Sequence, residues 1–146
     1  MTGTHPRLRA VWDLSVAEVR EYCGRHEYDG KIQDLSPAGV RAGLQALAAA
    51  GGDPLGDGHD EAHLAVFERA ARVAYGELGL HRTNPYPHIA NMDLSCYDRQ
   101  YAPPGERAAV RAAHLAAWPD AADGAVESLD AVAAPVGKAL AGAARG

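Results

Sequence analysis

Apolar residues recur every three or four positions along most of this chain, which is the spacing of one face of an α-helix. In residues 6–26 they fall at Leu8, Val11, Trp12, Val16, Val19, Tyr22 and Cys23. This spacing predicts an amphipathic helix over residues 6–26. The Asp-Gly pair in "EYDGK" predicts the turn that ends it.

Capping signals predict the next helix boundaries. Ser36 is typical of an N-cap and Pro37 of the first helical position, and the glycine pair at 51–52 predicts the end of this second helix. Residues 51–58, "GGDPLGDG", are typical of a loop. A third helix is expected to begin at Asp57 or His59 and to reach about residue 78. We expect its inward side to carry Val66, Phe67, Ala70, Val73 and Ala74.

Prolines predict the helix boundaries in the second half of the chain. Thr83 or Asn84 can cap a fourth helix, with Pro85 and Pro87 in its first turn, and this helix is expected to reach about residue 101. A fifth helix is expected over residues 104–118, where Pro119 kinks it or opens another. Helical spacing continues through Val126, Leu129 and Val132, and a short helix follows Pro135.

No segment alternates with the period of two that a half-buried strand requires. The sequence therefore predicts an all-α protein, a single helical domain over residues 1–146. Short connections favour an up-and-down bundle of five to six helices in which successive helices are antiparallel neighbours. With one phenylalanine and two tryptophans, the core is expected to consist mainly of Leu, Val and Ala.

The net charge of −5 excludes several classes of protein. No run of Lys or Arg provides the basic surface that a nucleic-acid binder needs. No apolar run is long enough to cross a bilayer, and the N-terminal residues lack the apolar stretch of a signal peptide. We therefore expect a soluble cytoplasmic protein that binds neither nucleic acid nor membrane. Cys23 and Cys96 are expected to be buried thiols without a disulfide.

The segment "HDEAH" places His59 and His63 four residues apart, on one face of the predicted helix, as a zinc or iron site requires. It is similar to the zincin motif HExxH, with Asp60 in place of the glutamate. The shorter side chain would hold a general base further from a metal-bound water. The alternative is helix capping, because acidic residues are stabilising at any helix N-terminus.

The segment "NPYPHIANMDLSCYD" is the second candidate for chemistry. On a helix it aligns His88, Asn91 and Ser95 in a polar stripe beside an apolar one formed by Ile89, Met92 and Cys96. Such a stripe is either the solvent edge of a helix or the lining of a pocket.

An up-and-down bundle would bring the end of the first helix, the end of the third, the start of the fourth and the end of the fifth to one end of the molecule. Four of the seven histidines would meet there. In an enzyme with this arrangement His88 or His114 is the acid or base and Glu77 or Asp93 orients it. The residues expected to bind the substrate are His26, His81, Asn91, Tyr22, Tyr86 and Trp118.

Three stretches resemble a known family in order and spacing: "GRHEYDGKIQDLSPAGVRAGLQAL", "ELGLHRTNPYP" and "YAPPGERAAVRAAHLAAWPDAADGAVESL". They are similar to the N-terminal helical region of the bacterial domain-of-unknown-function family numbered 885. Members of that family are similar to zinc peptidases because of an HExxH helix far downstream, beyond the part that this chain resembles. The resemblance therefore implies a detached N-terminal module or a shortened relative, and it carries over no catalytic residue.

Two classes of function remain open. The first is a non-catalytic binding or assembly module whose alanine-rich faces pack against a protein partner or a second copy of the chain. The second is a small-molecule enzyme of bacterial secondary metabolism that uses the histidine-lined pocket for acid–base chemistry. The twelve arginines and two lysines are typical of a high-GC bacterial genome. No motif in the sequence indicates a cofactor.

Overall fold

The structure is a computed structural model, and it describes residues 4–143. All regular structure in this range is helical, as the sequence predicts. The α-helices are α1 (Pro6–Asp13), α2 (Val16–Tyr22), α3 (Pro37–Ala49), α4 (Gly58–Ala71), α5 (Leu80–Thr83), α6 (Tyr86–Asn91), α7 (Pro104–Ala116), α8 (Trp118–Ser128) and α9 (Ala134–Ala143). Two 3₁₀ turns, η1 (His26–Tyr28) and η3 (Ser95–Asp98), and a π-helical segment, η2 (Arg72–Glu77), complete the described part.

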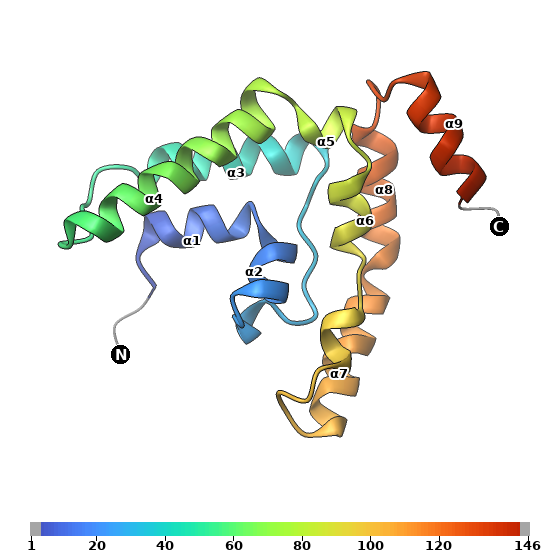
Figure 1. Cartoon of the computed structure of the whole chain (residues 1–146), viewed down its shortest axis with the longest axis horizontal. Coiled ribbons are helices and arrows are strands. Elements are labelled where there is room, and N and C mark those ends of the chain that lie inside the picture. The colour runs from blue at the N-terminus through green and yellow to red at the C-terminus, as the bar shows by residue number, and fades with distance from the viewer. Residues whose placement is uncertain (1–3, 144–146) are drawn as a thin grey trace.

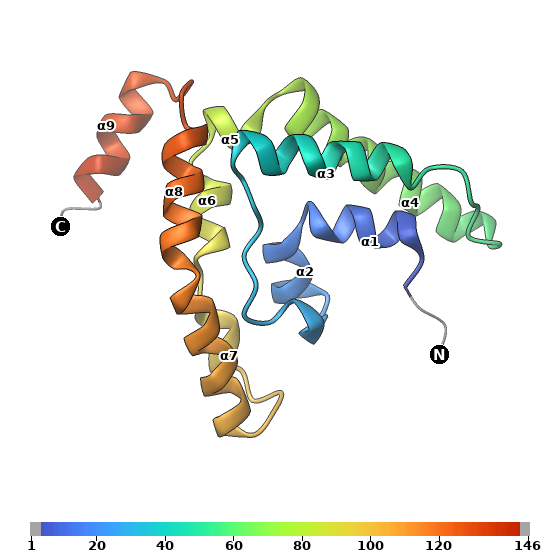
Figure 2. The ribbon, with the colours of Figure 1, turned by 180° about the vertical axis from the view of Figure 1, so that it is seen from behind.

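The helices form two groups that cross each other (Figure 1). In the first group α1, α3 and α4 lie side by side. In the second, α6 packs beside α8, and α7 continues directly into α8. Figure 2 shows the extended loop before α3 passing between the two groups. The structure does not confirm an up-and-down bundle of five or six helices. Several of the expected helices are divided into shorter ones that run in different directions.

The helix expected over residues 6–26 is divided at Leu14 and Ser15 into α1 and α2. Leu14 belongs to an apolar cluster that α1 forms with α3 and α4, whereas Val16 and Val19 pack with Tyr28 in a second cluster. Trp12 on α1 packs against this second cluster as well. The change of direction accompanies the burial of two separate apolar surfaces.

The predicted caps of the second and third helices are confirmed. The side chain of Ser36 accepts a hydrogen bond from the backbone N–H of Gly39, and Pro37 begins α3. The side chain of Asp57 accepts from the backbone N–H groups of His59 and Asp60 at the start of α4. These bonds satisfy N–H groups that have no partner within the helix.

The inward face predicted for the third helix is wrong for Val66, Phe67 and Ala70, which are exposed, whereas Val73 and Ala74 in η2 are half-buried. The buried face of α4 carries Leu64, Glu68 and Ala71, of which Leu64 and Ala71 belong to the apolar cluster. The guanidinium of Arg7 on α1 binds both carboxylate oxygens of Glu68, at 2.7 and 3.1 Å, which supplies the partner that a buried charge needs.

The fourth helix is shorter than the sequence predicts. α6 ends at Asn91, and the chain continues into η3 instead of a helix to residue 101. The carboxylate of Asp93 accepts hydrogen bonds from the backbone N–H and the hydroxyl of Ser95. Such local side-chain bonds compete with helical ones and end the helix.

Cys96 is buried, as expected, whereas the expectation that Cys23 is buried is wrong because it lies exposed at the end of α2. Burial raises the pKa of the Cys96 thiol. In the part of the chain that the structure describes, no helix has the length and apolarity needed to cross a membrane.

Candidate functional site

His114 on α7 is fully buried and has defined hydrogen-bond partners. Its Nε2 lies 2.8 Å from the backbone carbonyl oxygen of Asn91, so Nε2 carries the proton and donates. Nδ1 therefore accepts from the hydroxyl of Tyr97, at 3.1 Å, while the Tyr97 oxygen accepts from the backbone N–H of Gly30, at 2.8 Å. Burial lowers the pKa of His114 and raises that of Tyr97 to about 12, which keeps both groups neutral.

Asn91 on α6 connects this helix to the loop before α3. Its side-chain oxygen accepts from the backbone N–H of Gln33, at 2.7 Å, and its side-chain nitrogen donates to the Gln33 carbonyl, at 2.9 Å. The Gln33 side chain in turn donates to the carbonyl of Leu14. We call Gln33, Asn91, Tyr97 and His114 the buried polar network. It joins the first group of helices to the second.

His81 and His88 form a neighbouring buried pair. The Nε2 of His88 donates to the backbone carbonyl of His81, at 2.8 Å. The Nδ1 atoms of both rings are buried and have no hydrogen-bond partner within residues 4–143. Desolvation lowers the pKa of His81, which favours its neutral form.

The structure thus brings three of the four predicted histidines into one region. None of four surface cavities in the described part of the chain is lined by His81, His88 or His114. Of the two predicted orienting carboxylates, Glu77 is exposed at the end of η2 and Asp93 accepts hydrogen bonds from Ser95. The acid–base roles remain predictions, and the placement of these residues favours structural roles.

Four other predicted residues lie together at the surface. Tyr86, Asp93 and Trp118 line a groove of about 560 Å³ between α6 with η3 and α7 with α8. Tyr86 and Asp93 also line a smaller cavity with Tyr22, at the end of α2. Ile89, which the sequence places in the apolar stripe but not among the candidate site residues, lies in the groove beside Tyr86.

We call this larger cavity the apolar groove. Most of its lining is apolar, from Tyr86, Ile89, Ala90, Met92, Leu94 and Trp118. Polar residues form the remainder: Asp93, Ser95, Asp98 and Arg111. The guanidinium of Arg111 donates to Asp98 at 2.8 Å, which neutralises one of the two carboxylates and leaves Asp93 as the unpaired charge.

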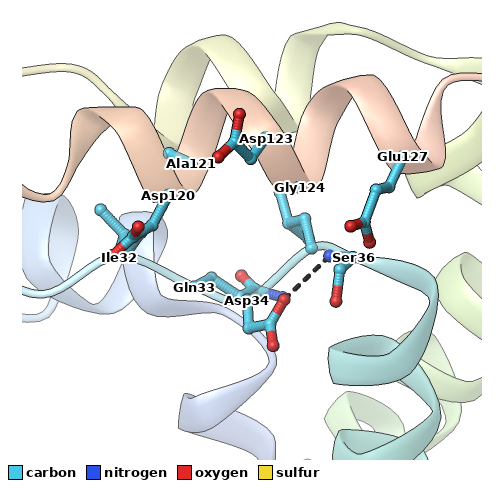
Figure 3. A pocket seen from close by; sticks show the side chains of 10 residues that line it. Ile32, Gln33, Asp34, Ser36, Asp120, Ala121, Asp123, Gly124 and Glu127 are labelled. Carbon is cyan, nitrogen blue, oxygen red and sulfur yellow. Dashed lines mark hydrogen bonds between the residues drawn. The ribbon is translucent and has the colours of Figure 1, made fainter.

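An acidic groove of about 410 Å³ lies between α8 and the loop before α3 (Figure 3). Asp34, Asp120, Asp123 and Glu127 line it, and none of them forms a salt bridge within the described residues. The carboxylate of Asp34 accepts a hydrogen bond from the backbone N–H of Ser36, at 3.0 Å, which stabilises the turn that enters α3.

His26, the fourth predicted histidine, does not join His81, His88 and His114: it contacts Asp29 and Tyr101 instead. It lines a fourth cavity, of about 290 Å³, together with Asp29, Tyr101 and the first turns of α7. Asp29 was missed because "EYDGK" indicates a turn. The spacing of three residues between His26 and Asp29 was the available signal.

His59 and His63 lie on one exposed face of α4, with ring centroids 4.3 Å apart. The predicted pair of imidazoles is thus in place. In residues 4–143, however, no group of three histidine, cysteine or carboxylate side chains is close enough together to hold a metal ion. A metal would have water in its remaining positions, so the metal site remains a prediction.

Comparison of the chain with protein families, with curated proteins and with solved structures finds no match.

Proposed function

We propose that this chain is a non-catalytic helical binding module whose recognition surface is the apolar groove. The single observation that supports this proposal most strongly is the position of three large apolar side chains in that groove. Tyr86, Ile89 and Trp118 are 68, 52 and 36% exposed, although α6 and α8 pack against each other directly below them. Tyrosine and tryptophan are the residue types that contribute most to protein interfaces.

The total surface of the chain also favours a partner. A compact monomer of 15.3 kDa is expected to expose about 7,100 Å². This chain exposes 8828 Å². The excess is about twice the area of about 800 Å² that each partner contributes to a standard protein interface. A partner on the groove would cover part of it.

Charge indicates the chemistry of that partner. Asp93 and Asp98 lie at the groove, and the adjoining cavity that shares Tyr86 adds Glu18, Glu21 and the guanidinium of Arg20. Arg111 and Arg99 pair with Asp98 and Glu21. Four carboxylates thus stand against three guanidinium groups, and this small excess of negative charge, on a chain of net charge −5, favours a basic partner.

We therefore assign to the groove an amphipathic helix that inserts an apolar face and carries lysine or arginine at its edge. A second copy of this chain fits less well, because a two-fold contact would place the same carboxylates opposite each other. In this proposal the module acts in the bacterial cytoplasm, and its kinship with the N-terminal region of family 885 remains part of the proposal.

Isothermal titration calorimetry with two model peptides tests the proposal. An 18-residue amphipathic Leu/Lys helix is expected to bind the protein saturably, and a Leu/Glu helix of the same length at least tenfold more weakly. Ile89→Asp and Trp118→Ala should each weaken Leu/Lys binding at least tenfold, because central aromatic and aliphatic anchors contribute about 2 kcal/mol or more.

Val126→Asp is the matched control. Val126 is 84% exposed on α8 and does not line the groove, so this change should leave binding within twofold. Equal binding of the two peptides, or an equal loss in the control, would contradict the proposal. A dimer in solution that Ile89→Asp dissociates would identify a second copy as the occupant and would overturn the assignment of a basic partner.

A further inference from the structure

The cavity beside His26 contains a histidine held in one orientation by a less exposed carboxylate. The Nδ1 of His26 lies 3.2 Å from Oδ2 of Asp29, and the side chains are 53 and 8% exposed. The Tyr101 hydroxyl donates to the same carboxylate oxygen, at 2.7 Å. Because Nδ1 donates to Asp29, Nε2 is left without a partner within the described residues and is available to a ligand.

Aromatic stacking fixes the histidine further. The rings of His26 and Tyr101 are nearly parallel, at 11°, with centroids 4.2 Å apart. These two residues are 75 positions apart in the chain, so the folded protein, and not local sequence, creates this arrangement. A side chain that is oriented in advance loses less entropy when a ligand binds.

Two opposite charges complete the wall of the cavity. Glu106 and Arg107, from the first turns of α7, both line it. Neither forms a salt bridge within residues 4–143. The Nε and Nη1 atoms of Arg107 donate to the backbone carbonyls of Ala102 and Tyr97, which holds the guanidinium in place without using a carboxylate.

The remaining wall is apolar and comes from Ala102 and Val110. With a volume of about 290 Å³, the cavity is near the lower end of the range for small-molecule sites. A ligand that matches this wall is small, carries one negative and one positive charge close together, and has an apolar side chain.

We propose that the cavity binds a zwitterion of the α-amino acid class. The ligand's carboxylate lies toward Arg107, its ammonium group toward Glu106 and its side chain toward Val110, and His26 Nε2 hydrogen-bonds the ligand. Asp29 is a positioning residue that acts through His26. This site is separate from the apolar groove, so its occupation does not depend on the proposed partner.

Nuclear magnetic resonance titration of the ¹⁵N-labelled protein tests the proposal with three probes of similar shape: L-leucine, 4-methylpentanoate and 3-methylbutylamine. L-Leucine is expected to shift the amide signals of residues 26–29 and 101–110 saturably. Each singly charged analogue should bind at least tenfold more weakly, because it lacks one of the two ionic contacts.

Glu106→Gln and His26→Phe should each weaken L-leucine binding about tenfold, and the phenyl ring retains the stack on Tyr101. Glu127→Gln, in the acidic groove, is the control and should leave binding unchanged. No saturable shift up to 50 mM, analogues that bind as well as L-leucine, or binding that survives both changes would overturn the proposal. Shifts at residues 86–94 instead would also overturn it, because they would place the ligand in the apolar groove.

Discussion

At the residue scale, the polar side chains that attract attention in the sequence are largely internal connections. His114 and Asn91 are almost fully buried, and each of their side-chain polar atoms has a partner. Buried polar groups with complete hydrogen bonding fix a unique arrangement of the surrounding helices. In the polar stripe that the sequence predicts, His88 and Asn91 are therefore buried and join neighbouring elements, whereas Ser95 is exposed.

The buried histidines predict a loss of stability in mild acid. The pKa values of His81 and His114 are lowered in the folded protein, whereas an unfolded histidine titrates near 6.5. Below about pH 6.5 these two histidines bind protons in the unfolded chain but stay neutral in the folded one. The free energy of unfolding should thus be constant above this pH and fall below it, by up to about 1.4 kcal/mol per pH unit for each histidine.

Urea unfolding followed by circular dichroism at pH 7.5, 6.5 and 5.5 measures this loss. His63→Gln, which removes an exposed histidine, should leave the profile unchanged. A flat profile over this range, or stability that rises toward acid, would show that the buried histidines are not held neutral.

Asn91→Ala should lower the free energy of unfolding by about 2–4 kcal/mol, because it leaves the buried N–H and carbonyl of Gln33 without partners. Asn84→Ala is the control: Asn84 is exposed and only caps Tyr86, so its loss should be about 1 kcal/mol. Chemical denaturation compares the two variants. Equal losses would contradict the role of Asn91 as a connector.

The sequence does predict which residue types can take part in chemistry, but not their neighbours. His26 meets Tyr101, and His114 meets Tyr97, through contacts that depend on how the elements pack. Spacing within one helix carries no information on such contacts. The expected meeting of His26 with the other three histidines assumed a bundle that the chain does not form.

At the element scale, the boundaries that local chemistry determines were predictable. Ser36, Pro37 and Asp57 act at helix starts through their own side chains or backbone, and each is found there. The divisions at Leu14 and Asp93 depend on tertiary packing and on a local competing bond, so periodicity alone missed them. The buried face of α4 includes Glu68, whose partner Arg7 lies about sixty residues away and could not be identified from helical spacing.

Two glycines in first helical turns give opposite predictions. A Cβ on Gly39 in α3 would lie 2.2 Å from Asp34 Cγ and 2.5 Å from the Asp34 carbonyl oxygen, so Gly39→Ala should lower the free energy of unfolding by about 1–3 kcal/mol. A Cβ on Gly105 in α7 meets nothing within 4 Å, so Gly105→Ala should raise it by about 0.5 kcal/mol. Thermal unfolding of both variants measures the difference. A gain from Gly39→Ala would contradict the close turn before α3.

At the scale of the whole molecule, the two groups of helices leave little buried apolar volume and a large exposed surface. The apolar clusters lie between α1, α3 and α4 and around Tyr28, whereas the second group is joined to them mainly through the buried polar network. The all-α class follows from periodicity. The way the two groups pack against each other does not follow from periodicity, because polar contacts between distant residues join them. This arrangement leaves the apolar groove exposed.

Hydrogen–deuterium exchange tests the central claim, that the apolar groove is a recognition surface, most directly. The protein is compared alone and saturated with the Leu/Lys helix. The account predicts slower exchange in residues 86–94 and 111–118, which form the groove, and unchanged exchange in α4, which also exposes Val66 and Phe67. Protection of α4 instead, or no protection at the groove, would contradict the claim.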